Sequence, residues 1–335
     1  MELSTKEYVG LGKVPVGIGA MMKGWGISEE HYRDINKFTI VNFRAMTEAC
    51  PHDCFHCFTD KTKRSLSLEE IKMIIDKLAA VGTSAIDYVG EGEPTIDPYF
   101  LDIINYTKKK GIQPVVYTDA ATMLRDKDFV KRLYNTGASV APKCDSLFNE
   151  EYQNWLVGDK KGVFFKERNE AISLLMDCGF NQVNDDATTR LGFDMVLSTR
   201  NMHEVDQTLR FCRENNIWII FSYFLPTGRS GMEEFDRTLV IKEEDKVIIR
   251  NIIKSIDAEY GFQHRVWNNL GTTRCIEFFH ILGNGDVTAC VANDDVVGNI
   301  VEKDPLELQE VILKKYPFHD RRTHDGHCTY KPKID

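Results

Sequence analysis

The chain has no long apolar run. Its longest runs, such as Ile217 to Phe221, are far shorter than the roughly 20 residues that a membrane-spanning helix requires. The N-terminus lacks the basic stretch followed by an apolar stretch that marks a secretory signal, and no internal repeat or low-complexity segment is visible. We therefore expect a cytoplasmic protein without a membrane partner.

An excess of basic residues is also missing. The formal net charge of −9 and the pI of about 5.6 argue against a nucleic-acid partner, because proteins that bind the phosphate backbone usually present a basic face. Nine cysteines, an odd number, argue against a disulfide framework and indicate free thiols in a reducing compartment. The 335 residues, 42% of them hydrophobic, allow one large α/β barrel with a smaller appendage.

What the sequence does contain is a close group of three cysteines. Cys50, Cys54 and Cys57 follow the spacing C-x3-C-x2-C. Three thiolates at this spacing can bind three corners of a cubane iron–sulfur cluster and leave the fourth iron open to a small molecule. Zinc is the alternative, with His52 or His56 completing the four ligands that a structural zinc site requires.

The segment from Glu48 to Phe58 resembles the signature of the radical S-adenosylmethionine (SAM) superfamily. The resemblance implies a [4Fe–4S] cluster whose open iron is chelated by SAM. It also implies that an electron, from a donor of the flavodoxin or ferredoxin type, splits SAM into methionine and a 5′-deoxyadenosyl radical. This radical takes a hydrogen atom from the substrate.

From residue 38 onward, short β-type runs alternate with amphipathic helical stretches. Ser67, followed by Glu69 and Glu70, predicts the capped and acidic start of the first helix. Six β-then-α units in a row predict a parallel sheet with right-handed crossovers. The expected strands are 38–43, 85–89, 114–118, 140–143, 193–197 and 218–224, and the expected helices are 66–80, 99–110, 128–135, about 168–178, 203–215 and 243–259.

Six units are too few for a closed eight-stranded barrel. We therefore predict an α/β fold, a partial (β/α)6 barrel like that of radical SAM enzymes, with a small C-terminal α+β domain. The expected divisions are an N-terminal extension over 1–37, the barrel over 38–231 and an auxiliary domain over 232–335. The chemistry is expected at the C-terminal ends of the strands, where the cysteine loop and several polar residues fall.

The second expected strand ends in Gly90-Glu91-Gly92-Glu93-Pro94. Glycines let the backbone approach a ligand closely. The segment resembles the GGE motif of radical SAM enzymes in a GEGEP form, which implies that Gly92 and Glu93, with Glu91 beside them, grip the amino group of SAM. A plain β-to-α turn is the alternative reading of the same residues.

Polar residues at other strand ends complete the predicted SAM site. Lys143 and Asp145 face the same way if the fourth strand continues. The stretch that begins at Lys143 resembles the glycyl-radical activating enzymes, which implies that this lysine pairs with the SAM carboxylate. Arg200 is a second candidate for that carboxylate. Asp119 could accept from a ribose hydroxyl, although Tyr117-Thr118-Asp119 departs from the Thr-Asn-Gly that is common in the family.

A second group of cysteines lies in the C-terminal part. Alternating residues on either side of Asn284-Gly285 predict a hairpin that brings Cys275 and Cys290 together. The spacing resembles SPASM and twitch domains, as does Gly298-Asn299-Ile300 before a helix from about Pro305.

The resemblance implies an auxiliary [4Fe–4S] cluster of the twitch type, held by Cys275, Cys290 and Cys328. Its remaining iron is either ligated by His324 or His327 or left open for the substrate. A zinc site and three ordinary thiols are the alternatives.

Three cysteines remain. Cys178 and Cys212 lie beside apolar residues in expected helices and are predicted to be in the core. Cys144 is a candidate donor of a hydrogen atom to a substrate radical, although strand alternation directs it away from Lys143. His56 could meet the adenine of SAM through its backbone.

We therefore interpret the chain as a radical SAM oxidoreductase that acts on a small molecule. The auxiliary cluster either accepts an electron from the substrate radical, as in a dehydrogenase, or anchors the substrate, and epimerisation and cyclisation are other outcomes. Some 40 residues precede the cysteine loop, fewer than the recognition domain of many peptide-modifying relatives, which favours a small molecule. Peptide modification and glycyl-radical activation remain alternatives. A non-catalytic zinc or iron–sulfur scaffold is the alternative from another class.

Overall fold

The structure is a computed structural model that describes residues 38–59, 61–183, 189–224, 237–260, 277–290 and 293–317. The predictions for residues 1–37, for Cys275 and Cys328, and for His324 and His327 fall outside these residues.

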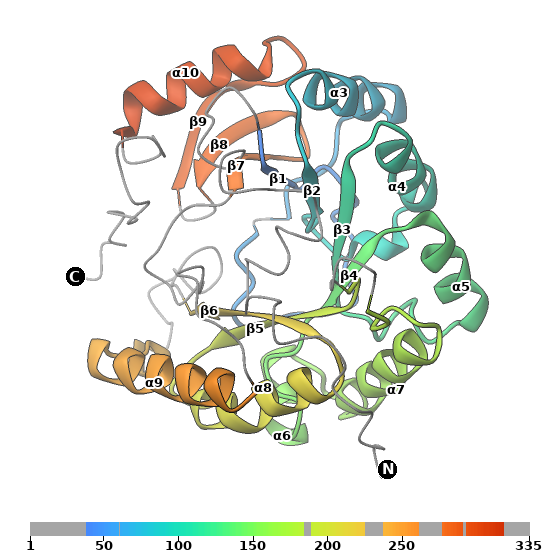
Figure 1. Ribbon diagram of the computed structural model, residues 1–335. Coiled ribbons are helices and arrows are strands. Elements are labelled where there is room, and N and C mark those ends of the chain that lie inside the picture. The colour runs from blue at the N-terminus through green and yellow to red at the C-terminus, as the bar shows by residue number, and fades with distance from the viewer. Residues whose placement is uncertain are drawn as a thin grey trace.

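Six parallel strands form the wall of an open barrel (Figure 1). β1 to β4 pair in sequence order, and β5 pairs with β6. Parallel bridges from Val140 to Leu191 and from Lys143 to Asp194 join the two groups. The mixed α/β fold with a parallel sheet is therefore confirmed. The strands are β1 Ile40–Phe43, β2 Ala85–Tyr88, β3 Gln113–Thr118, β4 Ser139–Pro142, β5 Gly192–Leu197 and β6 Trp218–Tyr223.

The helices lie outside this ring of strands (Figure 1). Most of them connect one parallel strand to the next, as the alternating sequence predicts. They are α3 Leu68–Ala80, α4 Phe100–Lys109, α5 Lys127–Thr136, α6 Glu150–Leu156, α7 Phe164–Asp177, α8 Val205–Glu214, α9 Glu243–Glu259 and α10 Pro305–Lys315, with short 3-10 turns η2 Pro94–Ile96, η3 Met202–Glu204 and η5 Arg237–Leu239.

Side-chain caps fix where several helices begin. Ser67 and Glu70 form the capping box that starts α3, since each side chain accepts from the backbone of the other residue. Asn149 accepts a hydrogen bond from the Tyr152 backbone and so starts α6, a short helix that the sequence analysis did not predict. α6 matters for the site because its C-terminal end meets the cysteine loop.

The C-terminal strands continue the barrel sheet. β7 (Glu277–Ile281) pairs in parallel with β1, on the side opposite β2, and β8 (Asp286–Cys290) and β9 (Asn293–Asn299) follow in antiparallel order. The predicted hairpin around Asn284-Gly285 is confirmed. Its turn is braced from β9 by Asn299, whose Nδ2 donates to the Asn284 carbonyl (3.1 Å) and to the Asp286 carboxylate (3.0 Å).

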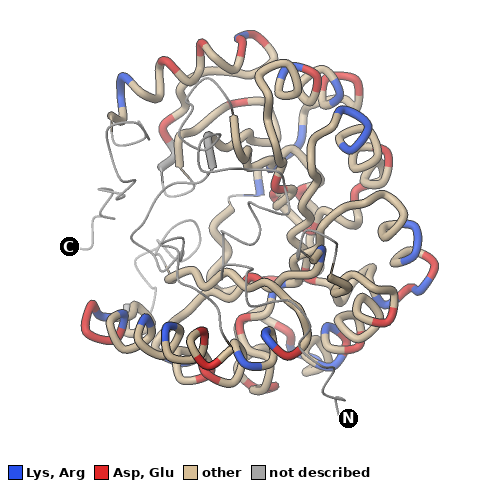
Figure 2. Tube along the Cα trace, in the orientation of Figure 1, with Lys and Arg blue, Asp and Glu red and all other residues tan. Residues whose placement is uncertain are grey.

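Apolar residues fill the space between strands and helices, and charged residues gather on the outer helices. Phe38 and Phe279 meet edge to face at 5.1 Å where β1 and β7 adjoin. Figure 2 shows most lysine, arginine, aspartate and glutamate on the outer helices and few on the strands. Within the described part of the chain, none of the helices has the length and apolar character needed to cross a bilayer.

Candidate active site

The cysteine loop is held by backbone hydrogen bonds on both sides. Before Cys50, the carbonyls of Thr47 and Ala49 accept from the amides of Gly92 and Glu93, each at 2.9 Å. After Cys50, the amides of Asp53 and Phe55 donate to carbonyls at the end of α6, at 3.1 and 2.8 Å. The glycine-rich turn and α6 therefore fix the loop that presents the three thiols.

Two glycines permit this close packing. A Cβ atom on Gly92 would lie 2.0 Å from the Ala49 carbonyl oxygen, which is far inside contact distance. Gly158 has a φ of +70°, and a Cβ there would lie 2.8 Å from the Asp53 carbonyl oxygen. At both positions the backbone runs directly against the cysteine loop, so only glycine fits without a shift.

Burial disfavours the thiolate form of two loop cysteines when no metal is bound. It raises the pKa of Cys54 to about 12 and also raises the pKa of Cys50. Metal coordination favours the thiolate form, so a bound iron centre suits these buried thiols. Cys54 packs against Ala121, Val157 and Phe164, which gives the site an apolar wall.

The two histidines of the loop face carboxylates. His52 Nε2 lies 2.8 Å from the Asp119 carboxylate, and His56 Nε2 lies 3.9 Å from that of Asp145. These contacts link the cysteine loop to the ends of the third and fourth strands.

Glu93 links the ends of β2 and β3. Its carboxylate accepts from Thr95, from the Thr118 hydroxyl (2.7 Å) and from the Asp119 amide (2.7 Å), and its side chain is almost fully buried. Burial, with the nearby Asp119 charge, raises the pKa of Glu93 to about 7. The carboxylate lies beside the cysteine loop, where the sequence analysis expected it.

Glu91 lies in a different environment. Its carboxylate forms a buried ion pair with Arg44 at 2.8 Å and accepts from the Thr62 amide. Its carbonyl accepts from the Thr59 hydroxyl at 2.8 Å. These contacts tie the glycine-rich turn to the end of β1 and to the chain that leaves the cysteine loop, and the role of Glu91 in binding SAM remains a prediction.

Asp119 is also engaged within the protein. Its carboxylate accepts from both the amide and the hydroxyl of Thr122 and meets His52 from the cysteine loop. The backbone at Ala120 has a φ of +62°, so the chain turns sharply after β3. Asp119 therefore joins the third strand end to the cysteine loop.

Lys143 lies between two carboxylates. Its ammonium is 3.3 Å from Asp145 and 3.8 Å from Asp194. Burial opposes the lysine charge, but these carboxylates outweigh it and raise the pKa of Lys143 above its usual value. Burial likewise opposes ionisation of Asp145, yet Lys143, His56 and the Val196 amide hold the pKa of Asp145 below its usual range. Lys143 and Asp145 do face the same way, as strand alternation predicts.

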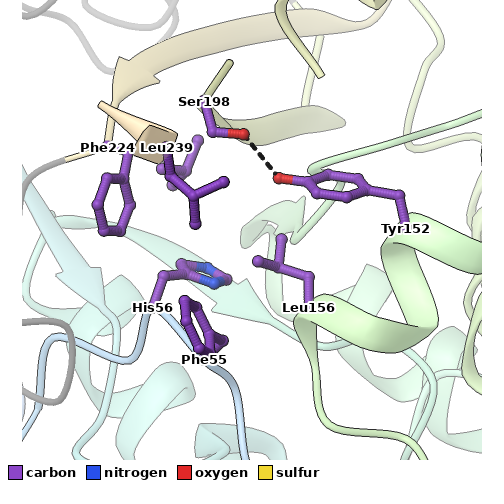
Figure 3. A pocket seen from close by; sticks show the side chains of 8 residues that line it. Phe55, His56, Tyr152, Leu156, Ser198, Phe224 and Leu239 are labelled. Atoms are coloured by element: carbon purple, nitrogen blue, oxygen red, sulfur yellow. Dashed lines mark hydrogen bonds between the residues drawn. The ribbon is translucent and has the colours of Figure 1, made fainter. Parts of the chain in front are cut away.

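A small pocket opens beside the cysteine loop (Figure 3). Apolar and aromatic side chains form most of its wall, while the Tyr152 hydroxyl meets the Ser198 hydroxyl at 2.9 Å. The free space has room for about one water molecule. The lining residues come from the cysteine loop, α6, the ends of β5 and β6, and η5: Phe55, His56, Tyr152, Leu156, Val196, Ser198, Phe224 and Leu239.

The two remaining barrel candidates do not line this pocket. The Arg200 guanidinium stacks over the Trp155 ring at 4.5 Å, and Trp155 in turn stacks on Phe55 of the cysteine loop. Cys144 is fully buried in the main core, and burial raises its pKa to about 11. Its role as a hydrogen donor remains a prediction.

Of the auxiliary cysteines, the structure describes Cys290 alone. It ends β8 and is partly exposed. Asp194 and the pocket residues Tyr152, Ser198 and Phe224 are not among the site residues predicted from the sequence. The period of two along the fifth strand could have indicated Asp194, because it places that carboxylate on the face opposite Phe193.

A model of the radical SAM superfamily matches residues 45–212, which is half of the chain. The match contains the cysteine loop, the glycine-rich turn and Lys143. The chain therefore belongs to the radical SAM superfamily, and the recognition made from the cysteine spacing is confirmed.

Curated relatives differ in their reactions. Fe-coproporphyrin III synthase of Methanosarcina barkeri is 25% identical over 210 residues, which cover 61% of this chain and 48% of that protein. GTP 3′,8-cyclase of Aeromonas hydrophila is 26% identical over 196 residues, 55% of this chain and 53% of that protein. The S-adenosylmethionine-dependent nucleotide dehydratase of Flammeovirga pacifica is 24% identical over 215 residues, 61% of this chain and 69% of that protein. The chain spans about half the length of the first two relatives.

Solved structures confirm the fold. Native anSMEcpe with bound AdoMet and Cp18Cys peptide has a TM-score of 0.64 at 15% identity and covers 84% of this chain and 83% of that chain. Streptococcus suis SuiB bound to S-adenosylmethionine has a TM-score of 0.60 at 16% identity and covers 86% of this chain and 68% of that chain.

Proposed function

We propose that this protein is a radical SAM oxidoreductase acting on a small molecule, with an auxiliary iron–sulfur cluster near Cys290. When bound, the [4Fe–4S] cluster supplies the electron that cleaves SAM to methionine and a 5′-deoxyadenosyl radical, which removes a hydrogen atom from the substrate. The observation that carries the proposal is the backbone junction between the cysteine loop and Gly92-Glu93.

In this proposal Cys50, Cys54 and Cys57 hold the first cluster. Glu93 accepts hydrogen bonds from the amino group of SAM, because its buried carboxylate lies at the same strand end as the thiols. Its raised pKa favours an ammonium partner, since a positive charge nearby stabilises the carboxylate that burial opposes.

We propose the small pocket as the binding site of the adenine ring of SAM. Its aromatic and aliphatic walls suit a flat apolar base, and the paired hydroxyls of Tyr152 and Ser198 offer polar contacts. The free space is narrow, so the proposal requires that Phe224 or Leu239 turn aside when the base enters. His56 would meet the base through its backbone.

Roles at the other polar residues follow from their surroundings. Lys143 and Arg200 remain the proposed partners of the SAM carboxylate, and Asp145 orients Lys143. Asp119 remains a proposed acceptor for a ribose hydroxyl. Cys290, with Cys275 and Cys328, is proposed to hold the auxiliary cluster, which either accepts an electron from the substrate radical or anchors the substrate.

A peptide substrate is the second candidate. SuiB, one of the similar folds, has a structure with its precursor peptide SuiA, at a TM-score of 0.61 and 15% identity. Curated relatives whose names refer to GTP or a nucleotide support a small molecule instead. A flavodoxin or ferredoxin remains the proposed electron donor.

The direct test is release of 5′-deoxyadenosine from SAM by anaerobically reconstituted protein with dithionite. We expect release by the wild-type protein and none by Cys54→Ser, which removes one proposed cluster ligand. Cys178→Ser is the matched control, because Cys178 lies at the end of α7, outside the site. A wild-type protein that binds iron but releases no 5′-deoxyadenosine would refute the proposal.

A further inference from the structure

The strand register defines which side chains face the inside of the barrel. Phe193 on β5 stacks on Phe211 of α8, so odd-numbered β5 positions near it face the helices. Tyr88 on β2 is hydrogen-bonded to Thr107 of α4 and faces outward in the same way. The alternate residues, among them Asp87 and Asp194, therefore face the lumen.

The lumen-facing residues of β5 and β6 form successive levels. Val196 pairs with Ser222 at the level of the pocket, and Asp194 pairs with Ile220 one level deeper. Two residues of strand separate these levels, which is roughly 7 Å. Below them Trp218 covers Gly192, where a Cβ atom would lie only 2.1 Å from the indole ring. Asp194 thus lies between the proposed SAM site and an indole floor.

Acidic groups outnumber basic groups beside Asp194. No lysine or arginine lies within strands β1 to β6. Lys143 follows β4 and stands nearest, but it is closer to Asp145 than to Asp194. With one ammonium between two carboxylates, the group keeps a net negative charge.

Asp194 is also open to a ligand. Its side chain is 23% exposed, whereas Asp145 is fully buried. Burial raises the pKa of Asp194, and Lys143 only partly offsets this effect. A second positive group beside Asp194 would therefore be stabilised, because Lys143 offsets only part of the cost of burying this carboxylate.

We infer that Asp194 binds the substrate, and that the substrate presents an ammonium or a hydroxyl donor to it instead of a phosphate or carboxylate. This inference rests on the proposed function, since it places the substrate in the lumen below SAM. It separates this chain from the reactions of the similar proteins named for GTP, whose triphosphate would face like charge at Asp194.

The charge preference is tested with three fragments of one size that differ in charge: ethanolamine, ethylene glycol and glycolate. Their binding to the reconstituted protein with SAM and no reductant is measured by saturation-transfer NMR titration. We expect ethanolamine to bind most tightly and glycolate most weakly. In Asp194→Asn the advantage of ethanolamine over ethylene glycol should fall about fivefold, the upper end of the range for one exposed ion pair.

Asp102→Asn is the matched control, because Asp102 is an exposed carboxylate on α4, outside the barrel. It should leave all three affinities unchanged. Equal preference for ethanolamine in wild type and Asp194→Asn, or tighter binding of glycolate, overturns the inference and leaves Asp194 as a residue that only holds Lys143.

A second measurement separates this inference from the proposed function. The affinity for SAM is measured in wild type and Asp194→Asn, because Asp194 lies 3.8 Å from Lys143, the proposed partner of the SAM carboxylate. If Asp194→Asn weakens SAM binding as much as it weakens the preference for ethanolamine, Asp194 acts in the SAM site through Lys143, and the inference fails while the proposed function stands. If the wild-type protein releases no 5′-deoxyadenosine from SAM, the proposed function itself fails, and the substrate assignment with it.

Discussion

The cysteine loop and the hairpin that carries Cys290, the two regions with proposed cluster ligands in the described chain, are held in different ways. The cysteine loop has backbone hydrogen bonds on both flanks, to the glycine-rich turn and to the end of α6. At Cys290 the bracing lies at the far end of the hairpin, around Asn284 and Asn299. The pairing of β8 with β9 shifts register twice between Val287 and Cys290.

This difference indicates what holds the cysteines in place at each proposed cluster site. The fold itself fixes the cysteine loop, so a change in the surrounding backbone should disturb the first site even when all three cysteines remain. The strand that carries Cys290 is irregular, so the geometry of the proposed auxiliary site should depend more on the bonds between its cysteines and the cluster. The proposed second site should therefore tolerate changes around it but depend on each thiol.

The largest effect is expected for Gly92→Ala. The new Cβ atom would overlap the Ala49 carbonyl, so the loop or the turn must move. We expect the free energy of unfolding to fall by about 3 kcal/mol or more, with loss of iron binding at the loop. Denaturant unfolding and iron analysis measure both. Gly111→Ala is the control: its φ is also positive (+82°) but no atom lies near, so about 1 kcal/mol is expected. Equal costs would contradict the close-packing argument.

Glu91→Gln should destabilise the same region by about 3 kcal/mol, because the Arg44 guanidinium would stay buried without its partner. The SAM affinity of the folded protein should not change. Glu69→Gln, an exposed glutamate that pairs with Lys72 on α3, should cost less than about 0.5 kcal/mol. A variant with normal stability and weakened SAM binding would instead support the predicted role of Glu91 in binding SAM.

Glu93 should make the stability of the apo-protein depend on pH. Its pKa of about 7 lies above the unfolded value of 4.5, so its stabilising contribution is full below pH 4.5 and is lost as the pH rises through 7. Between pH 5 and 8 the loss should be about 2 kcal/mol. Denaturant unfolding at several pH values, compared with Glu93→Gln, isolates this contribution. Parallel pH profiles for the two proteins would show that Glu93 titrates normally.

The smallest effect on stability is expected for Cys290→Ser, less than about 1 kcal/mol, because this thiol is partly exposed at a strand end. The iron content should nevertheless fall by about four per chain, the number in one [4Fe–4S] cluster. Cys212→Ser, in the core between barrel and helices, should show the reverse: lower stability and full iron content. Full iron content in Cys290→Ser would remove Cys290 from the proposed auxiliary site.

The sequence predicts the parallel barrel and its order well, because alternation and capping are local. The predicted helix 243–259 coincides with α9. The sequence does not predict α6, since only seven residues leave little periodicity to detect. Nor does it predict that β7 pairs with β1, because the residue pattern of a strand does not identify the strand with which it pairs. Glu91 illustrates the same limit: the motif places the residue, but its buried partner Arg44 determines what it does.

The pairing of β7 with β1 also bears on synthesis of the protein. Ile40 of β1 pairs with Glu277 of β7. One edge of β1 therefore has no partner strand until most of the chain has been translated. Until then its free backbone groups can pair with any extended segment of another molecule. A fragment that stops before residue 277 is therefore expected to aggregate instead of yielding a smaller independent enzyme.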